Sequence, residues 1–355
     1  MDRPVRHSVA MDAKVLTHFD DVLDARTPSE FAEDHIPGAV SAPVLSDAER
    51  AEVGTLYKQV SPFEAKKLGG ALVARNVAAH VERRFRDKPK DWKPLVYCWR
   101  GGKRSGAMAH ILREIGWDAV TLEGGYRAYR RWVVGQLDMV PGKFAYVVIH
   151  GPTGSGKSRL LAALAGAGAQ VLDLEGLAAH RGSVLGNLPD RPQPTQKMFE
   201  SLLLRELSRL DPSRPVFVEG ESKKIGQLQV PDGVLSRMRA SRCIALEAGR
   251  ATRVALLLDE YRHFTDDRAA LERQLDCLVA LHGREKIEGW KALAAGGAWR
   301  EFVAALLEEH YDPAYRKSAS RNFPQLAAAE RLEVASPESF AALAGRLLER
   351  ERAAA

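Results

Sequence analysis

The chain has 355 residues, 45% of them hydrophobic and 28% charged, which is ordinary for a folded globular protein and allows about two domains. No segment approaches the roughly 18 apolar residues that cross a membrane, and the start lacks the apolar core of a secretion signal, so we expect a cytoplasmic protein without a membrane partner. Three cysteines argue against a disulfide framework, and a formal net charge of +6 permits a polyanionic partner without requiring one.

The first part of the chain alternates strand-like with helix-like segments. Strands are expected at 21–25, 94–97 and 119–122, and helices at 29–34, 108–115 and 126–139. Pro141-Gly142 ends the last of these helices, so we place a domain boundary there. The predicted domains are residues 1–140 and 141–355.

The second part of the chain repeats this alternation and then becomes mostly helical from Arg250 onward. Strands are expected at 144–150, 170–173, 215–219 and 242–246, with a helix at 158–165. Strands that alternate with helices predict a parallel sheet. The predicted fold class is therefore α/β in both domains, with a helical C-terminal part. Cys243 and Cys277 lie in apolar runs, and we expect both to be buried.

One motif places a thiol at the end of an expected strand, in Cys98-Trp-Arg-Gly-Gly-Lys-Arg-Ser105. Backbone N–H groups of such a loop and the start of the next helix form an anion site, and neighbouring cations lower the pKa of a thiol. We therefore predict that Cys98 is catalytic. The rest of the predicted anion loop is Trp99, Arg100, Gly101, Gly102, Lys103, Arg104 and Ser105. Trp99 either covers the thiol or only packs, and both interpretations remain open.

A second motif, Gly151-Pro-Thr-Gly-Ser-Gly-Lys-Ser158, is a complete phosphate loop between an expected strand and helix. Its predicted diphosphate-binding residues are Gly151, Thr153, Gly154, Ser155, Gly156, Lys157 and Ser158, and Ser158 could ligate Mg²⁺. Acidic residues that could support a metal follow the next strands, and further substrate contacts are expected nearby. These candidates are Asp173, Glu175, His180, Arg181, Ser183, Glu219 and Glu221. None forms a clean Walker B motif. A ligand that carries a diphosphate and is not hydrolysed as ATP is therefore credible.

The first domain resembles the rhodanese family. The similarity lies in Asp24-Ala-Arg-Thr-Pro-Ser-Glu-Phe31, in His35-Ile-Pro-Gly-Ala39 and in Cys98 through Gly125. Common sulfurtransferase loops place an arginine five residues after the cysteine, whereas Arg104 is six residues after Cys98. Related phosphatases share this longer loop, which suits a tetrahedral oxyanion, so the resemblance implies a phosphate derivative as ligand.

A rhodanese-like domain followed by a phosphate-loop domain resembles the bacterial tRNA 2-selenouridine synthases. Shared motifs also include Asp173-Leu-Glu, His180-Arg-Gly-Ser183 and Glu219-Gly-Glu-Ser222. The resemblance implies a transferase that replaces sulfur by selenium in wobble 2-thiouridine, through an S-geranylated base. Geranyl diphosphate and selenophosphate would be co-substrates, and an enzyme that makes selenophosphate would be a possible partner. Cys98 would hold selenophosphate directly or carry the selenium.

Basic residues are candidates for binding the phosphate backbone of a tRNA partner. Arg127, Arg130 and Arg131 are three of them and share one face of an expected helix. Further candidates are Lys223, Lys224, Arg316 and Lys317, although each cluster could equally be a solvated surface. Two other functions remain open. One is a kinase-like phosphate-loop enzyme fused to a sulfurtransferase-like or phosphatase-like domain acting on a small molecule. The other is a non-catalytic anion-binding module, against which the intact Cys98, Lys157 and Ser158 argue.

Overall fold

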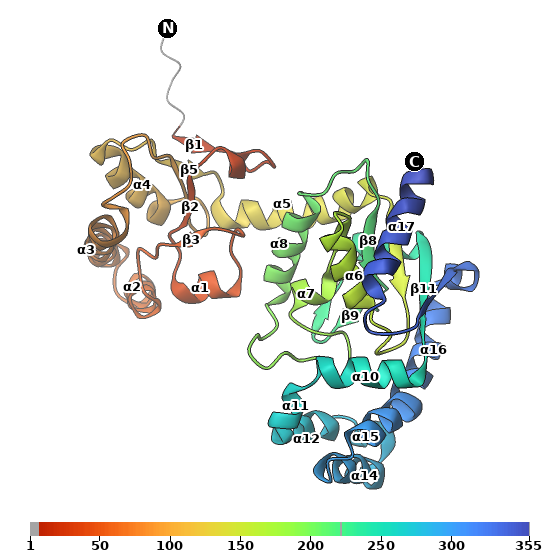
Figure 1. Cartoon of the computed structure of the whole chain (residues 1–355). Helices are drawn as coiled ribbons and strands as arrows, with labels where there is room; N and C mark the ends of the chain where they lie inside the picture. Colours follow the sequence, from red (N-terminus) through yellow and green to blue (C-terminus); the bar gives the residue numbers. More distant parts are fainter. Residues whose placement is uncertain (1–6, 221, 355) are drawn as a thin grey trace. The chain divides into compact units, whose positions relative to one another are not determined.

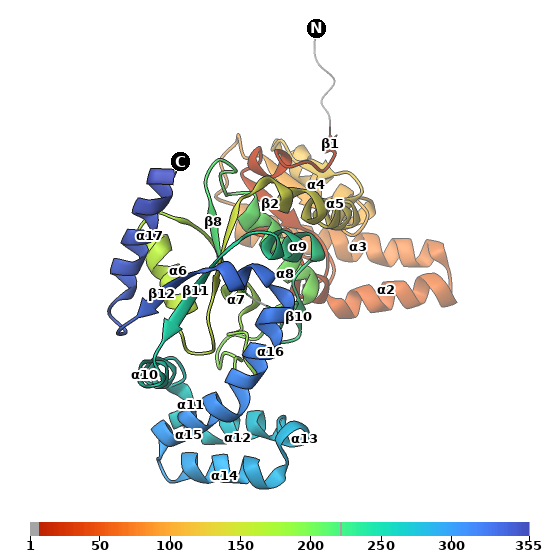
Figure 2. The same cartoon turned by 90° about the vertical axis from the view of Figure 1, so that its right-hand side faces the viewer.

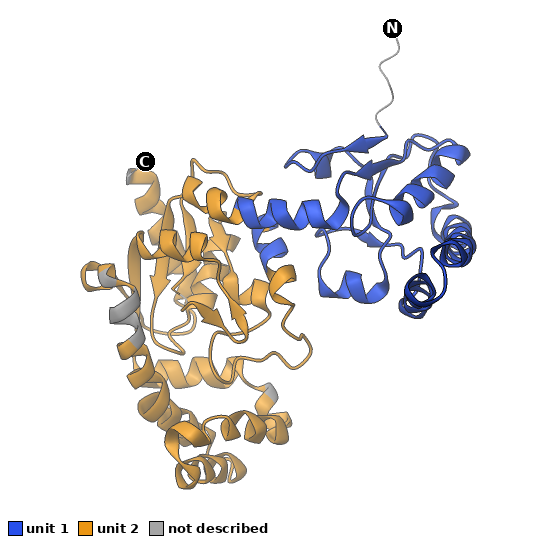
Figure 3. Ribbon diagram, turned by 180° about the vertical axis from the view of Figure 1, so that it is seen from behind, with its two compact units in different colours: residues 1–136, 200–205 blue, residues 137–199, 206–355 orange. Residues whose placement is uncertain are grey.

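The computed structural model describes residues 7–220 and 222–354, without the side chains of residues 263, 318–322, 324 and 354. The chain forms two compact units, which Figure 3 colours separately. The first contains the residues up to Gln136 together with Glu200–Arg205, and the second contains Leu137–Phe199 and Glu206–Ala355. That the short segment 200–205 belongs to the first unit was not predicted from the sequence.

The first unit is built on a five-stranded sheet in the order β1-β5-β4-β2-β3, in which every pair of neighbours is parallel (Figure 1). The strands are β1 (Ser8–Val9), β2 (Asp21–Asp24), β3 (Val40–Ser41), β4 (Pro94–Tyr97) and β5 (Val120–Leu122). All four residues of β4 are buried, which is typical of a central parallel strand. This strand carries Cys98 at its carboxyl end.

The helices of the first unit are η1 (Val15–Thr17), α1 (Pro28–Glu33), α2 (Asp47–Gln59), α3 (Pro62–His80), the π-helical η2 (Val81–Phe85), α4 (Lys103–Ile115) and α5 (Gly125–Met139). Three of them, α1, α2 and α3, begin at residues whose side chains cap the helix. Thr27 with Glu30 and Ser46 with Glu49 form capping boxes at the starts of α1 and α2. The hairpin of α2 and α3, which extends from the sheet in Figure 2, was not predicted from the sequence.

The second unit contains another five-stranded parallel sheet, in the order β12-β11-β6-β8-β7. Its strands are β6 (Tyr146–His150), β7 (Gln170–Leu172), β8 (Val216–Glu219), β11 (Arg242–Ala248) and β12 (Glu330–Val334), and a small antiparallel hairpin joins β9 (Lys224–Ile225) to β10 (Leu228–Gln229). The α/β fold class with parallel sheets is confirmed. β12 was missed because it is an edge strand in which only Leu332 and Val334 are buried.

The remaining helices surround this sheet and form the C-terminal part. They are η3 (Val140–Lys143), α6 (Lys157–Gly166), α7 (Leu174–Ala178), α8 (Gln196–Leu207), α9 (Asp232–Arg239), α10 (Arg250–Glu260), α11 (His263–Asp266), α12 (Arg268–Asp276), α13 (Val279–His282), α14 (Arg284–Ala295), α15 (Trp299–Leu306), the π-helical η4 (Leu307–Tyr311), α16 (Asp312–Asn322), η5 (Pro324–Ala328) and α17 (Phe340–Ala354). α6 and α17 lie side by side in Figure 1 and pack on the sheet. Leucines of both helices belong to one apolar cluster with residues of the strands.

Helices α10 to α15 and η4 enclose a second apolar core of their own. Cys277, at the end of α12, faces away from this core and is exposed, so the expectation that it is buried was wrong, whereas Cys243 is buried as expected. Within the described residues, 7–220 and 222–354, no helix is both long and apolar enough to span a membrane.

Candidate functional sites

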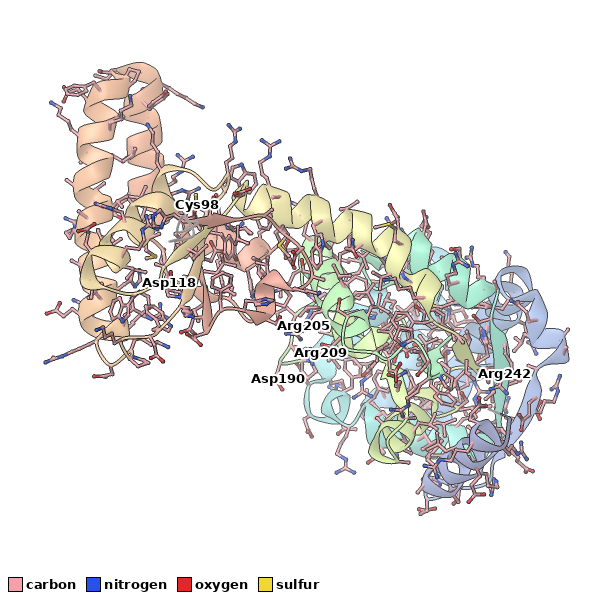
Figure 4. All side chains as sticks on the ribbon, turned by 90° about the horizontal axis from the view of Figure 1, so that it is seen from above. Cys98, Asp118, Asp190, Arg205, Arg209 and Arg242 are labelled. Carbon is pink, nitrogen blue, oxygen red and sulfur yellow. The ribbon has the colours of Figure 1, made fainter. Side chains whose placement is uncertain are left out.

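Cys98, labelled in Figure 4, lies on the loop between β4 and α4 and is 4% exposed. Its Sγ accepts a hydrogen bond from the backbone N–H of Gly102 at 3.4 Å and another from the Ser105 hydroxyl at 3.2 Å. Burial by itself raises the pKa of the Cys98 thiol. The hydrogen bonds from Ser105 and Gly102 and the charge of Arg104 outweigh that effect, and the pKa is lowered from its ordinary value. The loop is therefore built to stabilise a thiolate.

Two glycines let this loop approach the start of α5. Gly101 has φ +64° and Gly125 has φ +56°, and a Cβ added to Gly125 would lie 2.1 Å from the Cys98 carbonyl oxygen. The same carbonyl accepts from the N–H of Tyr126 at 2.8 Å, and that of Trp99 accepts from the N–H of Arg127 at 3.1 Å. The segment Glu123-Gly124-Gly125 therefore supports the cysteine loop.

The mouth of the Cys98 loop is a pocket of about 620 Å³ lined by Cys98, Trp99, Arg100, Gly102, Lys103, Arg104 and Arg50. Arg50, from α2, was not identified from the sequence, because nothing near it marks an anion site. Arg104 donates to both carboxylate oxygens of Glu30, at 2.6 and 3.2 Å. Burial raises the pKa of Glu30, but the bonds from Arg104 and Thr27 lower it overall, so the carboxylate holds the guanidinium in place.

Trp99 lines this pocket and also stacks on Tyr126, with ring centroids 5.3 Å apart. The Tyr126 hydroxyl donates to Oδ2 of the fully buried Asp34 at 2.7 Å, and the Ser201 hydroxyl donates to its Oδ1 at 2.9 Å. Arg26 lies 4.0 Å from the centre of the Tyr126 ring and is paired with Asp24. A buried polar network thus supports Trp99 from behind.

The phosphate loop lies between β6 and α6, as its sequence context predicted. Lys157 Nζ donates to the carbonyl of Gly151 at 3.0 Å, and the Ser158 hydroxyl donates to Glu175 Oε2 at 3.1 Å. Glu219 is 1% exposed and accepts from the backbone N–H of Glu175 at 2.7 Å. The loop, the lysine and two carboxylates from successive strand ends therefore meet at one edge of the sheet.

An arginine that the sequence did not single out holds the loop against α10. Arg253 is 7% exposed, donates from Nε to the carbonyl of Thr153 at 2.9 Å, and binds both oxygens of Asp312 at 3.0 and 2.5 Å. Gly154, at φ +77°, has no room for a side chain, because a Cβ would lie 2.8 Å from Leu257 of α10. The helical part thus fixes the loop conformation.

His150, the last residue of β6, was also missed. It is 1% exposed, and its ring packs edge-on against Phe323 at 4.2 Å between centroids. Burial, and then the charge of Lys157, lower its pKa to about 4. The imidazole is therefore neutral near pH 7 and adds no charge beneath the phosphate loop.

The pocket above the phosphate loop has a volume of about 360 Å³. Among the predicted residues it is lined by Gly151, Thr153, Gly154, Gly156, Lys157, Ser158, Glu175, Arg181 and Ser183. Tyr261 contacts two of these side chains: its hydroxyl lies 3.0 Å from that of Ser183, and the guanidinium of Arg181 lies 5.2 Å from its ring centre. Arg181 and Ser183 thus join the loop from the opposite wall.

Other predicted residues lie outside that lining. Asp173 caps α7 by accepting from the N–H of Gly176 at 2.7 Å, and the buried His180 ring accepts from the N–H of Gly182 at 3.1 Å. Both positions shape the segments that carry Glu175 and Arg181. Ser155 is buried within the loop, and Glu221 lies outside the described residues.

A magnesium ion fits the donors at Ser158. The Ser158 hydroxyl and the Glu175 carboxylate lie 3.1 Å apart, and Mg²⁺ usually takes one or two such oxygens together with phosphate and water. A protein-only metal cage is a different matter. In the part of the chain that the structure describes, no group of three His, Cys, Asp or Glu side chains could form one.

The basic candidates differ in their surroundings. Arg127 and Arg131 of α5 are exposed, whereas Arg130 is half-buried and forms an ion pair with Glu200. Lys223 pairs with Asp232 at 2.9 Å. Lys224, Arg316 and Lys317 are exposed. The three arginines of α5 therefore share a helical spacing but not one role.

Known proteins resemble both parts of the chain. A family model for the rhodanese-like domain matches residues 10–131, and one for the tRNA 2-selenouridine synthase AAA domain matches residues 144–283. Curated proteins named tRNA 2-selenouridine synthase are 38% identical in Nitrosomonas europaea, over 68% of this chain and 63% of that protein, and 38% identical in Bdellovibrio bacteriovorus, over 68% and 64%. The two matches thus span somewhat less than two thirds of those relatives. The relative from a Sulfurovum species is 32% identical over 85% of this chain and 89% of its own length. The chain therefore belongs to the tRNA 2-selenouridine synthase family.

Proposed function

We propose that the protein replaces the sulfur of wobble 2-thiouridine in tRNA by selenium, through an S-geranylated base, with geranyl diphosphate and selenophosphate as co-substrates. Family membership supports the tRNA substrate. The observation that carries the two-step chemistry is the presence in one chain of a complete phosphate loop and a loop that stabilises a thiolate. Each loop suits one of two successive half-reactions.

The first half-reaction is an alkylation at the phosphate loop. The sulfur of 2-thiouridine attacks C1 of the geranyl group, the C1–O bond breaks, and its electron pair leaves with the diphosphate while the base loses its N3 proton. Lys157 and the loop N–H groups stabilise the charge on the leaving diphosphate. Magnesium bound by Ser158 and Glu175 would neutralise part of the same charge.

The second half-reaction uses the Cys98 loop, whose cations and N–H groups suit the phosphoryl end of selenophosphate. A bond between Cys98 and selenium would require an oxidant, because selenophosphate carries fully reduced selenium. Attack by the thiolate on phosphorus needs none: an S–P bond forms, the P–Se bond breaks, and selenide leaves with the electron pair. Water then hydrolyses the phosphocysteine to phosphate and free thiol.

Selenide completes the exchange by attacking C2 of the geranylated pyrimidine. The C2–S bond breaks, and geranyl thiolate leaves and takes up a proton. Alkylation is what makes this displacement feasible, because an unmodified thiocarbonyl sulfur is a poor leaving group. The order of the two half-reactions follows from that difference.

The proposal is tested by nucleoside mass spectrometry of an anticodon stem-loop that contains 2-thiouridine. With geranyl diphosphate alone, S-geranyl-2-thiouridine should accumulate, and later addition of selenophosphate should convert it to 2-selenouridine. ATP turnover with an unchanged RNA would contradict the proposal and favour a kinase-like enzyme that acts on a small molecule.

A further inference from the structure

A second, apolar cavity of about 50 Å³ lies in the helical part of the second unit. Helices α10, α11, α12 and α15, which lie together in Figures 1 and 2, supply most of its walls. The lining residues are Thr153, Leu185, Leu257, Leu258, Tyr261, Phe264, Thr265, Leu271, Trp299, Phe302, Val303, Leu306 and Tyr311.

This cavity adjoins the pocket of the phosphate loop. Thr153, Leu257, Tyr261 and Tyr311 line both. Leu257 packs so closely on Gly154 that the loop and the apolar wall are in direct contact, and Arg253 ties the same helix to the carbonyl of Thr153. A ligand whose charged end is bound by the phosphate loop therefore has an apolar compartment next to it.

The lining excludes charged and strongly polar groups. It consists of aliphatic and aromatic side chains with two threonines and two tyrosines, and the Tyr261 hydroxyl already faces Ser183 at 3.0 Å. A polar group buried here would lose its hydrogen bonds to water without a replacement, whereas a hydrocarbon would lose nothing. The compartment is therefore suited to a hydrocarbon chain.

We infer that this cavity receives the far end of the isoprenoid chain of the diphosphate substrate and limits its length. The identity of the chain rests on the function proposed above. An apolar cavity of about 150 Å³ holds one benzene ring. The present cavity is smaller, so it admits the terminal carbons of a short chain, while the carbons near the diphosphate stay in the larger pocket.

Val303 on α15 provides the first test, because it lines the cavity and is only partly buried. Val303→Phe should fill the space. The matched control is Val279→Phe, which makes the same change at a partly buried valine packed on the same core but outside the cavity lining. Binding of geranyl diphosphate and of inorganic diphosphate is measured by calorimetry on the full chain, without RNA.

We expect the wild type to bind geranyl diphosphate about a hundredfold more tightly than inorganic diphosphate, since one methylene in an apolar site is worth roughly 10-fold or more. Val303→Phe should remove at least about tenfold of that preference and leave the affinity for inorganic diphosphate unchanged. Val279→Phe should change neither. Equal binding of the two ligands by the wild type, or equal losses in both variants, would overturn the inference.

Trp299 tests the limit on length from the other side. It is half-buried at the cavity wall, and Trp299→Ala should enlarge the space. Relative kcat/KM for dimethylallyl, geranyl and farnesyl diphosphates should then shift toward farnesyl by about tenfold. If Val303→Phe and Trp299→Ala both transfer the prenyl group with the wild-type preference among the three chain lengths, the inference is overturned and the proposed function stays intact. If geranyl diphosphate binds in a way that depends on the cavity but is not transferred to RNA, the inference stands and the proposed function is overturned.

Discussion

Both anion sites follow a central buried strand and precede a helix, yet they hold charge in different ways. At the Cys98 loop the reactive atom belongs to the protein, and Ser105, Gly102 and Arg104 lower its pKa despite burial. At the phosphate loop the protein offers no comparable nucleophile, and Lys157 donates to the Gly151 carbonyl, an acceptor that a phosphate oxygen can replace. In the proposed mechanism, the same strand–loop–helix unit would serve covalent attack in one place and departure of a leaving group in the other.

Their surroundings differ in the same sense. The pocket at Cys98 is lined by four cations, as a small, highly charged ligand requires. The pocket at the phosphate loop adjoins an apolar cavity, which suits a ligand with one charged and one apolar end. Substitutions at the two loops should therefore separate the two proposed half-reactions.

The largest effect is expected from Cys98→Ala. Without the thiolate, selenide cannot be released from selenophosphate, so formation of 2-selenouridine should fall below detection while geranylation continues at nearly the wild-type rate. Mass spectrometry of the stem-loop measures both products. Selenation by this variant at the normal rate would end the assignment of Cys98 as nucleophile.

The converse effect is expected from Lys157→Ala. Loss of one charge-assisted contact to the diphosphate should cost on the order of 3 kcal/mol, which is about a hundredfold in the rate of geranylation. A stem-loop that already carries S-geranyl-2-thiouridine should still be selenated by this variant. If selenation of that intermediate falls equally, the two loops do not serve separate steps.

A smaller effect concerns RNA binding by α5. Arg127→Glu with Arg131→Glu removes two exposed cations and leaves the Arg130–Glu200 pair in place. The log–log slope of tRNA affinity against salt should flatten by about 1.4 to 1.8, because each phosphate contact contributes roughly 0.7 to 0.9.

The control for that double variant reverses Arg83 and Arg86, which are also exposed and belong to the same unit. It changes the net charge equally, so a general loss of attraction would appear in both. Identical slopes in the two double variants would mean that this face of α5 is only solvated.

The subtlest effect is a shift along the pH axis. The pKa of Cys98 lies below its ordinary value, so the thiolate persists to lower pH than in a free cysteine. Ser105→Ala removes a donor to the sulfur and should move the inflection of Cys98 alkylation by iodoacetamide to higher pH. Wild type and variant should react alike well above both inflections. An unmoved inflection would show that Ser105 does not stabilise the thiolate.

The sequence predicted the two loops and the strands that carry them because each depends on local features: an apolar run, glycines and a fixed spacing. Gly124 and Gly125 illustrate a limit of that information. Gly124 has no room for a side chain because Ala128, four residues on, lies against it, whereas Gly125 is crowded by the Cys98 carbonyl, a contact between residues far apart in the chain.

Arg50, Arg253 and His150 could not be predicted for the same reason. Arg50 reaches the Cys98 pocket because the α2–α3 hairpin packs where it does, and Arg253 matters only because α10 lies behind the phosphate loop. No spacing in the sequence encodes these contacts. Asp173 and His180 show the opposite limit, since both stand in motifs and both serve the local backbone.

The placement of residues 200–205 has a consequence for anyone who wishes to divide this protein. α8 begins and ends in the second unit, yet its middle contributes Ser201 to the buried Asp34 carboxylate of the first. A fragment cut near residue 140 would lose that donor, at a cost of about 1 to 3 kcal/mol, and would expose the surface that α8 covers. A transplantable rhodanese-like module would therefore have to be engineered as two pieces, by appending the α8 segment through a new linker, and not by shortening the gene.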